Sequence, residues 1–132
     1  DARWFIKKAT DYANDRQVFG REIGKNQGIQ FPIAEAYMAT EAANLMVEKA
    51  AAVYEAGGRA GAEANMAKYL ASEASWQAAD MCMQTHGGFA FAEEYDVERK
   101  FRETRLYRIA PVSNNLVLSF IGEHVLGMPK SY

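Results

Sequence analysis

Glycine-rich breaks divide this chain into segments in which apolar residues recur at helical spacing. That spacing places apolar side chains on one face of an α-helix, and no segment shows the alternation of apolar and polar residues typical of a half-buried strand. The pattern therefore predicts an all-α protein. Expected helices cover about residues 1–18, Gln27–Ala56, Ala60–Thr85, Tyr95–Arg102 and Ala110–Leu126.

The four longer segments predict an up-and-down four-helix bundle, with the short charged helix of residues 95–102 inserted before the last one. Gly20, Gly24 and Gly28 should end the first helix near Val18, because each glycine costs about 1 kcal/mol in a helix interior. Pro111 fits the first position of the last helix, where proline is tolerated. That helix is apolar on nearly every side, so we expect it to be the most enclosed.

The apolar positions also predict which faces of the helices pack. In the first helix they are Ala2, Phe5, Ile6, Ala9 and Ala13. In the second helix Phe31, Ala34, Met38, Ala42, Leu45 and Val53 share one face. The third helix carries two stripes, Met66, Leu70, Ala74 and Met81 on one side and Tyr69, Trp76 and Met83 on another. The second stripe packs either on another domain or subunit, or inside this domain.

Length, composition and charge limit the possible functions. A chain of 132 residues, 49% hydrophobic and 24% charged, is expected to be one globular domain. Its net charge of -2 argues against nucleic acid as a partner. No stretch is apolar enough to predict a membrane span. The lone Cys82 fits a small buried residue in a reducing compartment, for which we expect the cytoplasm, with the mitochondrial matrix as the alternative.

The first residue is Asp1, and a helical pattern begins at once. We therefore expect a longer polypeptide from which this chain is a piece.

Metal and hydrolase sites are not predicted. A carboxylate di-iron centre needs two Glu-x-x-His pairs, whereas the only histidines, His86 and His124, are not preceded by glutamate at that spacing. No nucleophile motif surrounds either one, so both are interpreted as structural. The Gly87–Gly88 pair follows a helix and not a strand, so it predicts no Rossmann site.

Ligand-binding chemistry is instead expected at the helix breaks. Arg16, Phe19 and Gly20 combine a cation, an aromatic ring and a flexible backbone that together suit a nucleotide pyrophosphate. The alternative for Arg16 is a solvated side chain near a helix C-terminus.

Gln84, Gly87 and Gly88 combine an amide with a backbone that a ligand can approach closely, and the alternative here is a glycine helix cap. The basic residues Arg99, Lys100, Arg102, Arg105 and Arg108 alternate with Glu98 and Glu103, which favours a salt-bridged, solvated helix.

Two segments, YANDRQVFGREIGKNQGIQFPIAE and QTHGGFAFAEEYDVERKFRETRL, resemble signatures of the acyl-CoA dehydrogenase family, and the resemblance covers almost the whole chain. It implies the C-terminal helical domain of a flavoprotein whose N-terminal helical and middle β-domains lie outside this chain. In the family, the residues matching Arg16, Phe19, Gln84 and Gly88 contact FAD bound mainly by a neighbouring subunit, which implies a homo-oligomer, a dimer or a tetramer.

Gly87 belongs to the same glycine break and is included among the candidate FAD contacts. By the same resemblance, the residues matching Ser113 and Asn115 approach the flavin at the start of the last helix, a position that suits an electron-rich or phosphate-bearing ligand.

The family reaction converts an acyl-CoA thioester to its 2,3-enoyl form: a carboxylate takes the α-proton and hydride passes to FAD. Pro111 stands where most members carry that glutamate, and proline cannot act as a base. Because some members place the base on the preceding helix, we expect it upstream of Asp1 and assign no catalytic residue in this chain. The alternatives are a non-catalytic flavin-binding or oligomerisation scaffold, or a relative of acyl-CoA oxidases or nitroalkane oxidases.

Overall fold

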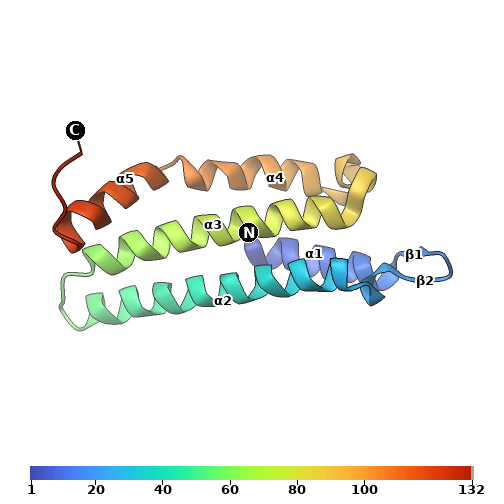
Figure 1. Cartoon of the computed structure of the whole chain (residues 1–132), viewed down its shortest axis with the longest axis horizontal. Helices are drawn as coiled ribbons and strands as arrows, with labels where there is room; N and C mark the ends of the chain where they lie inside the picture. The colour runs from blue at the N-terminus through green and yellow to red at the C-terminus, as the bar shows by residue number, and fades with distance from the viewer. Residues whose placement is uncertain (132) are drawn as a thin grey trace.

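The computed structural model describes residues 1–131 and contains five α-helices around one core (Figure 1). They are α1 (Ala2–Asp15), α2 (Gln27–Glu55), α3 (Gly61–His86), α4 (Val97–Arg105) and α5 (Asn114–Phe120). The 3₁₀-helices η1 (Ile23–Lys25), η2 (Gly87–Phe91), η3 (Glu93–Tyr95) and η4 (Leu106–Arg108) join them, and the π-helix η5 (Ile121–Val125) extends α5.

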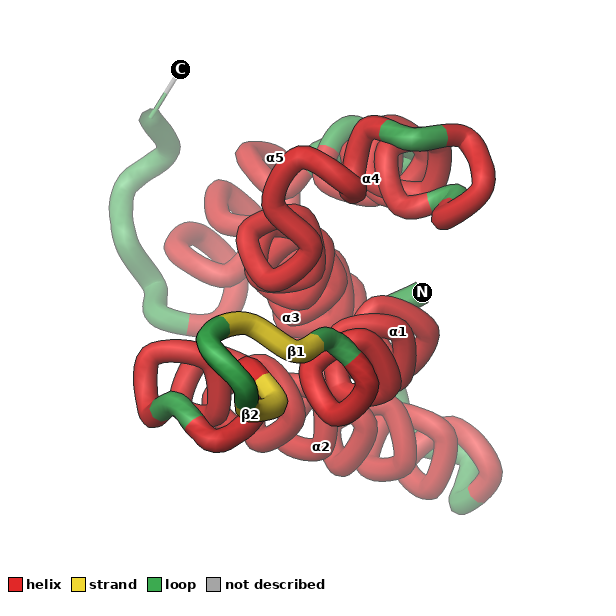
Figure 2. Tube along the Cα trace, turned by 90° about the vertical axis from the view of Figure 1, so that its right-hand side faces the viewer, coloured by secondary structure: helices red, strands yellow, loops and turns green. Residues whose placement is uncertain are grey.

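Helix α3 is the centre of the bundle, and α1, α2, α4 and α5 all pack against it. Viewed end-on, α1 and α2 lie on one side of α3, and α4 and α5 lie on the other (Figure 2). The all-α bundle is confirmed. Figure 1 adds that α4 and α5 follow one another along α3, so the charged helix and the last helix share the fourth position of the bundle.

Small side chains make up most of the core. Phe5, Val97 and Cys82 are fully buried, but most of the remaining buried positions are alanines, including Ala9, Ala36 and Ala78. Alanine lets helix backbones approach closely, and the distance between packed helices follows the side chains at the contact. The apolar face predicted for α1 and the burial of Cys82 are therefore confirmed.

The first helix ends at Asp15 and not near Val18. A small antiparallel hairpin follows, in which β1 (Gln17–Val18) pairs with β2 (Arg21–Glu22). Phe19 and Gly20 form its turn with φ values of 53° and 76°. Two turn residues with positive φ match the twist of paired strands, so the chain leaves the helix early to form this hairpin.

The last helix begins at Asn114, so the prediction that it starts at Ala110 with Pro111 in its first position is wrong. Ser113 is the N-cap, and its side chain accepts a hydrogen bond from the Leu116 N–H at 3.3 Å. Serine is a strong N-cap residue, and Pro111 lies outside the helix in the preceding turn. After Phe120 the helix widens into η5, which contains Gly122.

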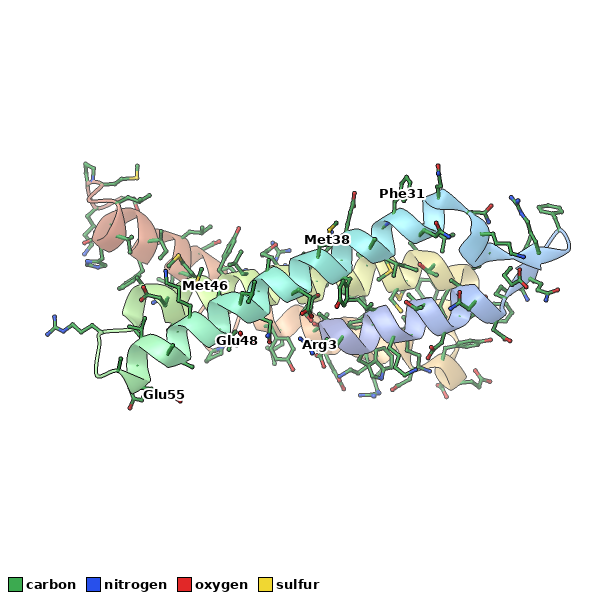
Figure 3. The ribbon with its side chains drawn as sticks, turned by 90° about the horizontal axis from the view of Figure 1, so that it is seen from below. Arg3, Phe31, Met38, Met46, Glu48 and Glu55 are labelled. Atoms are coloured by element: carbon green, nitrogen blue, oxygen red, sulfur yellow. The ribbon has the colours of Figure 1, made fainter. Side chains whose placement is uncertain are left out.

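Two predictions of burial are also wrong. The last helix is not the most enclosed, because Leu116, Leu118 and Val125 are each about half exposed, as it packs on α3 along one side only. The predicted apolar face of α2 points outward: Phe31, Met38 and Leu45 are 55%, 62% and 65% exposed. Figure 3 shows Phe31 and Met38 along the edge of α2 that faces away from α1.

In α3, by contrast, both apolar stripes face the domain interior for most of their length. Ala74 and Met81 are buried, and Trp76 and Met83 are partly buried. Because α3 is surrounded by four helices, it needs more than one apolar face, which favours the interior alternative.

Helix α4 carries the predicted ion pairs. Arg99 contacts Asp96 and Glu103, and Arg102 contacts Glu98 at 2.8 Å. These side chains are largely exposed, so each pair contributes little to stability. No helix within residues 1–131 is both long and apolar enough to cross a membrane.

Candidate cofactor site

A cleft of about 480 Å³ lies where the ends of α1 and α3 meet. Tyr12 comes from α1, Arg16 is the residue that follows α1, and Val18 comes from the strand β1. The remaining walls come from Ile23, from the end of α3 and from η2, and include Gln84, Thr85, His86, Gly87, Gly88 and Phe89. The fold thus joins two segments that the sequence places far apart, and the cleft contains four of the predicted contact residues.

Arg16 is the cation of this cleft. It caps α1 in an extended conformation, and its backbone N–H donates to the Tyr12 carbonyl at 2.8 Å. The guanidinium carbon lies 5.3 Å from the centre of the Phe89 ring, a cation–π contact that orients it. Among residues 1–131 no carboxylate pairs with Arg16, so its guanidinium is available to an anion.

The glycine pair leaves backbone open at the cleft wall. Gly87 has φ 58° and ψ -134°, a conformation that a side chain would strain, so part of its role is to end α3. Gly88 has no such requirement, and a Cβ atom added at either glycine would meet nothing within 4 Å. The exposed Gln84 side chain makes no hydrogen bond within the described chain, so its amide can both donate and accept.

The base of the cleft is an aromatic cluster that the sequence reasoning did not identify. His86 is 4% exposed and stacks on Tyr12 with ring centres 4.2 Å apart. Tyr95 meets His86 edge-on at 5.6 Å, and Phe89 lies 5.5 Å from Tyr95. The available signal was the helical spacing of Tyr12 and Arg16, which places the ring and the cation on the same face of α1.

Burial lowers the pKa of His86, although the hydrogen bond to the Cys82 carbonyl opposes this effect. The imidazole is therefore neutral at pH 7. Burial raises the pKa of the neighbouring Cys82 thiol to about 12, which makes it an inert packing residue.

The other three predicted contact residues lie elsewhere. Phe19 does not line the cleft but is fully exposed at the tip of the hairpin. Ser113 and Asn115 belong to the start of α5, which contacts α3 at Ser72 through the neighbouring Asn114. Gln84 lies roughly three turns farther along α3, which corresponds to about 18 Å.

A polar network holds the start of α5 against α3. The buried Asn114 accepts hydrogen bonds from Lys68 and from the Ser72 hydroxyl, the latter at 3.0 Å. Asn114 also donates to Glu73 at 2.7 Å, and the same carboxylate oxygen accepts from Arg108 at 2.7 Å. The network fixes the turn of residues 109–113 that contains Pro111.

A second cavity, of about 450 Å³, adjoins that turn. Its lining includes Pro111, Ala110, Tyr107 and Lys68, together with small residues of α2 and α3. Asp1 is the only carboxylate in the described lining, and its Oδ1 pairs with the Lys100 amine at 2.7 Å. Residues 1–131 contain no cluster of three or more histidine, cysteine, aspartate or glutamate residues that could hold a metal ion.

Comparison with known proteins gives one consistent result. The profile of the family "Acyl-CoA dehydrogenase, C-terminal domain" matches residues 1–126. The chain is 42% identical over 132 residues to the acyl-CoA dehydrogenase FadE12 of Mycobacterium tuberculosis, covering 98% of this chain and 34% of the relative. It thus spans about a third of the length of the curated relatives it matches.

Solved structures agree with the sequence comparison. The glutaryl-coenzyme A dehydrogenase–glutaryl-CoA complex is similar with a TM-score of 0.90 at 35% identity, covering 98% of this chain and 33% of that one. The FAD complex of PigA is similar with a TM-score of 0.91 at 28% identity, covering 96% and 33%. Sequence and fold therefore show that this chain belongs to the acyl-CoA dehydrogenase family and corresponds to its C-terminal domain.

Proposed function

We propose that this chain is the C-terminal helical domain of a longer FAD-dependent acyl-CoA dehydrogenase, and that it supplies part of an FAD site and a subunit interface. The observation that carries the proposal is the meeting of Arg16, Gln84, Gly87 and Gly88 at one cleft. The chain's share of its relatives' length supports N-terminal helical and middle β-domains elsewhere in the polypeptide.

The cleft fits a phosphate-bearing dinucleotide. A guanidinium binds phosphate oxygens with two parallel hydrogen bonds, and Arg16 has no competing carboxylate in the described chain. Gly88 leaves space that no part of the described chain fills, which permits close approach by a ligand. Phe19 presents a free aromatic face beside this region, suited to a nucleotide base. Bound FAD would accept the hydride removed from the acyl chain.

The separation of the two groups of candidate contacts is what we expect if they serve the FAD molecules of different subunits in a homo-oligomer. Arg16, Gln84, Gly87 and Gly88 gather at one end of α3, whereas Ser113 and Asn115 lie about 18 Å away along that helix. We assign the first group to the FAD of a neighbouring subunit and the second to the FAD of its own subunit. The assembly is then a dimer or a tetramer.

The catalytic base belongs to a part of the polypeptide upstream of Asp1. Pro111 has no group that can accept a proton, and the only carboxylate lining the adjacent cavity in the described chain, Asp1, is already paired with Lys100. Glu73, which lies on α3 between the lining residues Ser72 and Ala74, accepts hydrogen bonds from both Arg108 and Asn114, so its carboxylate is already engaged. The chain's role toward the acyl-CoA substrate is therefore to shape the site.

FAD binding by the full-length protein tests the cofactor site. Arg16→Ala should weaken FAD binding about 10- to 100-fold, because it removes a charge-assisted hydrogen bond worth roughly 1.5–3 kcal/mol. Titration of the apoprotein with FAD, followed by flavin fluorescence, measures the change. Arg59→Ala is the matched control, since Arg59 is also exposed but lies outside the cleft. Equal affinity of the Arg16→Ala and wild-type proteins would contradict the assignment.

Anaerobic mixing with a panel of acyl-CoA thioesters tests the reaction. We expect the flavin absorbance of the full-length protein to bleach with at least one thioester. Replacing each upstream carboxylate in turn by its amide should abolish bleaching in one variant while FAD remains bound. If every such variant bleaches normally, the base does not lie upstream of Asp1.

Pro111 favours a second candidate function, a non-catalytic flavin-binding or oligomerisation scaffold of the same fold. No bleaching by any acyl-CoA, with FAD bound, would support the scaffold. Oxygen consumption coupled to bleaching would instead indicate an acyl-CoA oxidase or a nitroalkane oxidase-type relative.

A further inference from the structure

His86 is a polar residue inside the cleft for which the fold supplies only half of the hydrogen bonds it can make. His86 lines the cleft with Arg16 and Gln84, yet it is only 4% exposed. Stacking on Tyr12 at an interplanar angle of 24° and the edge contact with Tyr95 hold the ring in one orientation. A polar ring this fixed presents each nitrogen in a defined direction.

The hydrogen bond at Nδ1 decides which nitrogen carries the proton. Nδ1 lies 2.9 Å from the Cys82 carbonyl oxygen, and a carbonyl can only accept, so Nδ1 bears the hydrogen. A neutral imidazole has one N–H and one lone pair. The lone pair is therefore on Nε2, which becomes a hydrogen-bond acceptor.

Nε2 has no partner within residues 1–131. Among the fully buried side-chain nitrogen and oxygen atoms of that part of the chain, only Glu22 Oε2 makes no hydrogen bond, and it forms an ion pair with the Lys25 amine at 2.6 Å. Nε2 is thus not sealed in the core, and because His86 lines the cleft, we infer that Nε2 is accessible from it. A largely buried acceptor beside a free guanidinium points to a ligand that brings both a phosphate and a donor group.

We propose that His86 is a specificity-determining contact of this cleft, in which Nε2 accepts a hydrogen bond from an O–H or N–H group of the phosphate-bearing nucleotide that Arg16 binds. This inference rests on the proposed cofactor site and adds a residue to it. Arg16 selects the negative charge, and His86 selects a hydroxyl or amino group close to that charge. A phosphate without such a donor gains nothing from His86.

A pair of substitutions separates ligand contact from structural support. His86→Asn can keep the hydrogen bond to the Cys82 carbonyl but removes the acceptor at the Nε2 position. His86→Gln can place an amide oxygen near the Nε2 position but loses the bond to Cys82. FAD binding to the full-length protein should weaken about fivefold to tenfold in His86→Asn, the value of one net hydrogen bond, and less in His86→Gln. His124→Asn, at an exposed histidine outside the cleft, is the control.

Thermal unfolding of the FAD-free proteins gives the readout for structural damage. If His86 were merely structural, His86→Gln would lose both stability and FAD affinity, and His86→Asn would keep both. That result overturns the proposal. If the wild-type protein binds no FAD, the proposed function is contradicted. If the wild-type protein binds FAD and His86→Asn binds it with the same affinity, only the role of His86 is contradicted.

The pH dependence of FAD affinity is an independent test whose main readout is the wild-type protein. Protonation at Nε2 would convert the acceptor into a donor, so wild-type affinity should be constant above about pH 6.5 and fall at lower pH, and His86→Asn should not show the fall. Affinity that rises on acidification would mean that the imidazolium contacts a phosphate, and it overturns the acceptor role. The titratable and charged groups around the ring are Lys8 and Tyr12 on α1, Arg16 just after α1, Cys82 on α3 and Tyr95 on η3.

Discussion

At the residue scale, the chemistry of this chain depends on a few polar side chains that are held in place by others. Arg16 is oriented by Phe89, His86 by Tyr12 and Cys82, and Asn114 by Glu73 and Ser72. His86 and Asn114 are buried, and a buried polar group is costly when it loses a partner. Their contribution can therefore be tested by single substitutions.

Asn114→Ala removes the residue at the centre of the network that holds the turn of residues 109–113. Lys68, Ser72 and Glu73 would each lose a hydrogen bond in a partly buried setting, and we expect a loss of about 2 kcal/mol in the free energy of unfolding. Chemical denaturation measures it. Asn115→Ala is the matched control. Asn115 is the exposed neighbour of Asn114, so its substitution should change the free energy of unfolding by less than about 0.5 kcal/mol. Equal effects of the two substitutions would mean that the network contributes no stability.

Cys82 should react slowly with thiol reagents in the native protein. Its pKa is raised to about 12 from an ordinary value of 9.0, so the folded thiol stays protonated at a pH where the unfolded thiol ionises. Between those two pH values the folded state binds more protons than the unfolded state. The free energy of unfolding should therefore fall as the pH rises through that range. Mass spectrometry of the Cys82 peptide after alkylation at pH 8, with and without urea, measures reactivity. Rapid labelling without urea would contradict the burial.

At the element scale, the connections between helices were harder to predict than the helices themselves. The second and third helices occupy nearly their predicted ranges, since long apolar periodicity determines them. The hairpin and the start of α5 were missed, because each depends on a local competition: positive φ at Phe19 and Gly20 in one case, and capping by Ser113 in the other. Short-range hydrogen bonds of this kind outweigh average propensity.

Two glycines near the start of α2 make a matched test of the connection between α1 and α2. A Cβ atom at Gly24 would lie 2.9 Å from the Ala13 carbonyl oxygen, so Gly24→Ala should destabilise the protein by roughly 1–3 kcal/mol. A Cβ atom at Gly28 would meet nothing within 4 Å, and Gly28→Ala should stabilise α2 by up to about 1 kcal/mol. Denaturation midpoints give both values. If both substitutions stabilise the protein, the backbone at Gly24 does not lie as close to Ala13 as the structure shows.

At the scale of the whole molecule, this bundle leaves a large part of its apolar surface uncovered. Phe31, Met38 and Leu45 repeat along the outer edge of α2, and Leu116 and Leu118 are exposed on α5. Exposed apolar surface of this extent is typical of a contact with another domain or subunit. Periodicity identifies such a face but does not say what covers it.

Oligomeric state tests the outer face of α2. In the full-length protein, Met38→Glu and Leu45→Glu should each reduce the molar mass in solution, because a carboxylate would be buried without a partner in a subunit interface. Light scattering coupled to size-exclusion chromatography measures the mass. Glu48→Gln, which changes a charge on α2 away from that face, should leave it unchanged (Figure 3). An unchanged mass in both glutamate variants would exclude this face as the subunit interface.

The sequence by itself determined the helical class, the extent of the two long helices and the family, because each depends on spacing and motifs along the chain. Tertiary structure alone decided that Arg16 and Gln84 share a cleft while Ser113 and Asn115 lie elsewhere, and that His86 lies in the cleft floor. It also placed the apolar stripe of α2 outside. The reason is physical: periodicity specifies which residues share a face, but only the packing of one helix on another decides which face is buried and which chain ends meet.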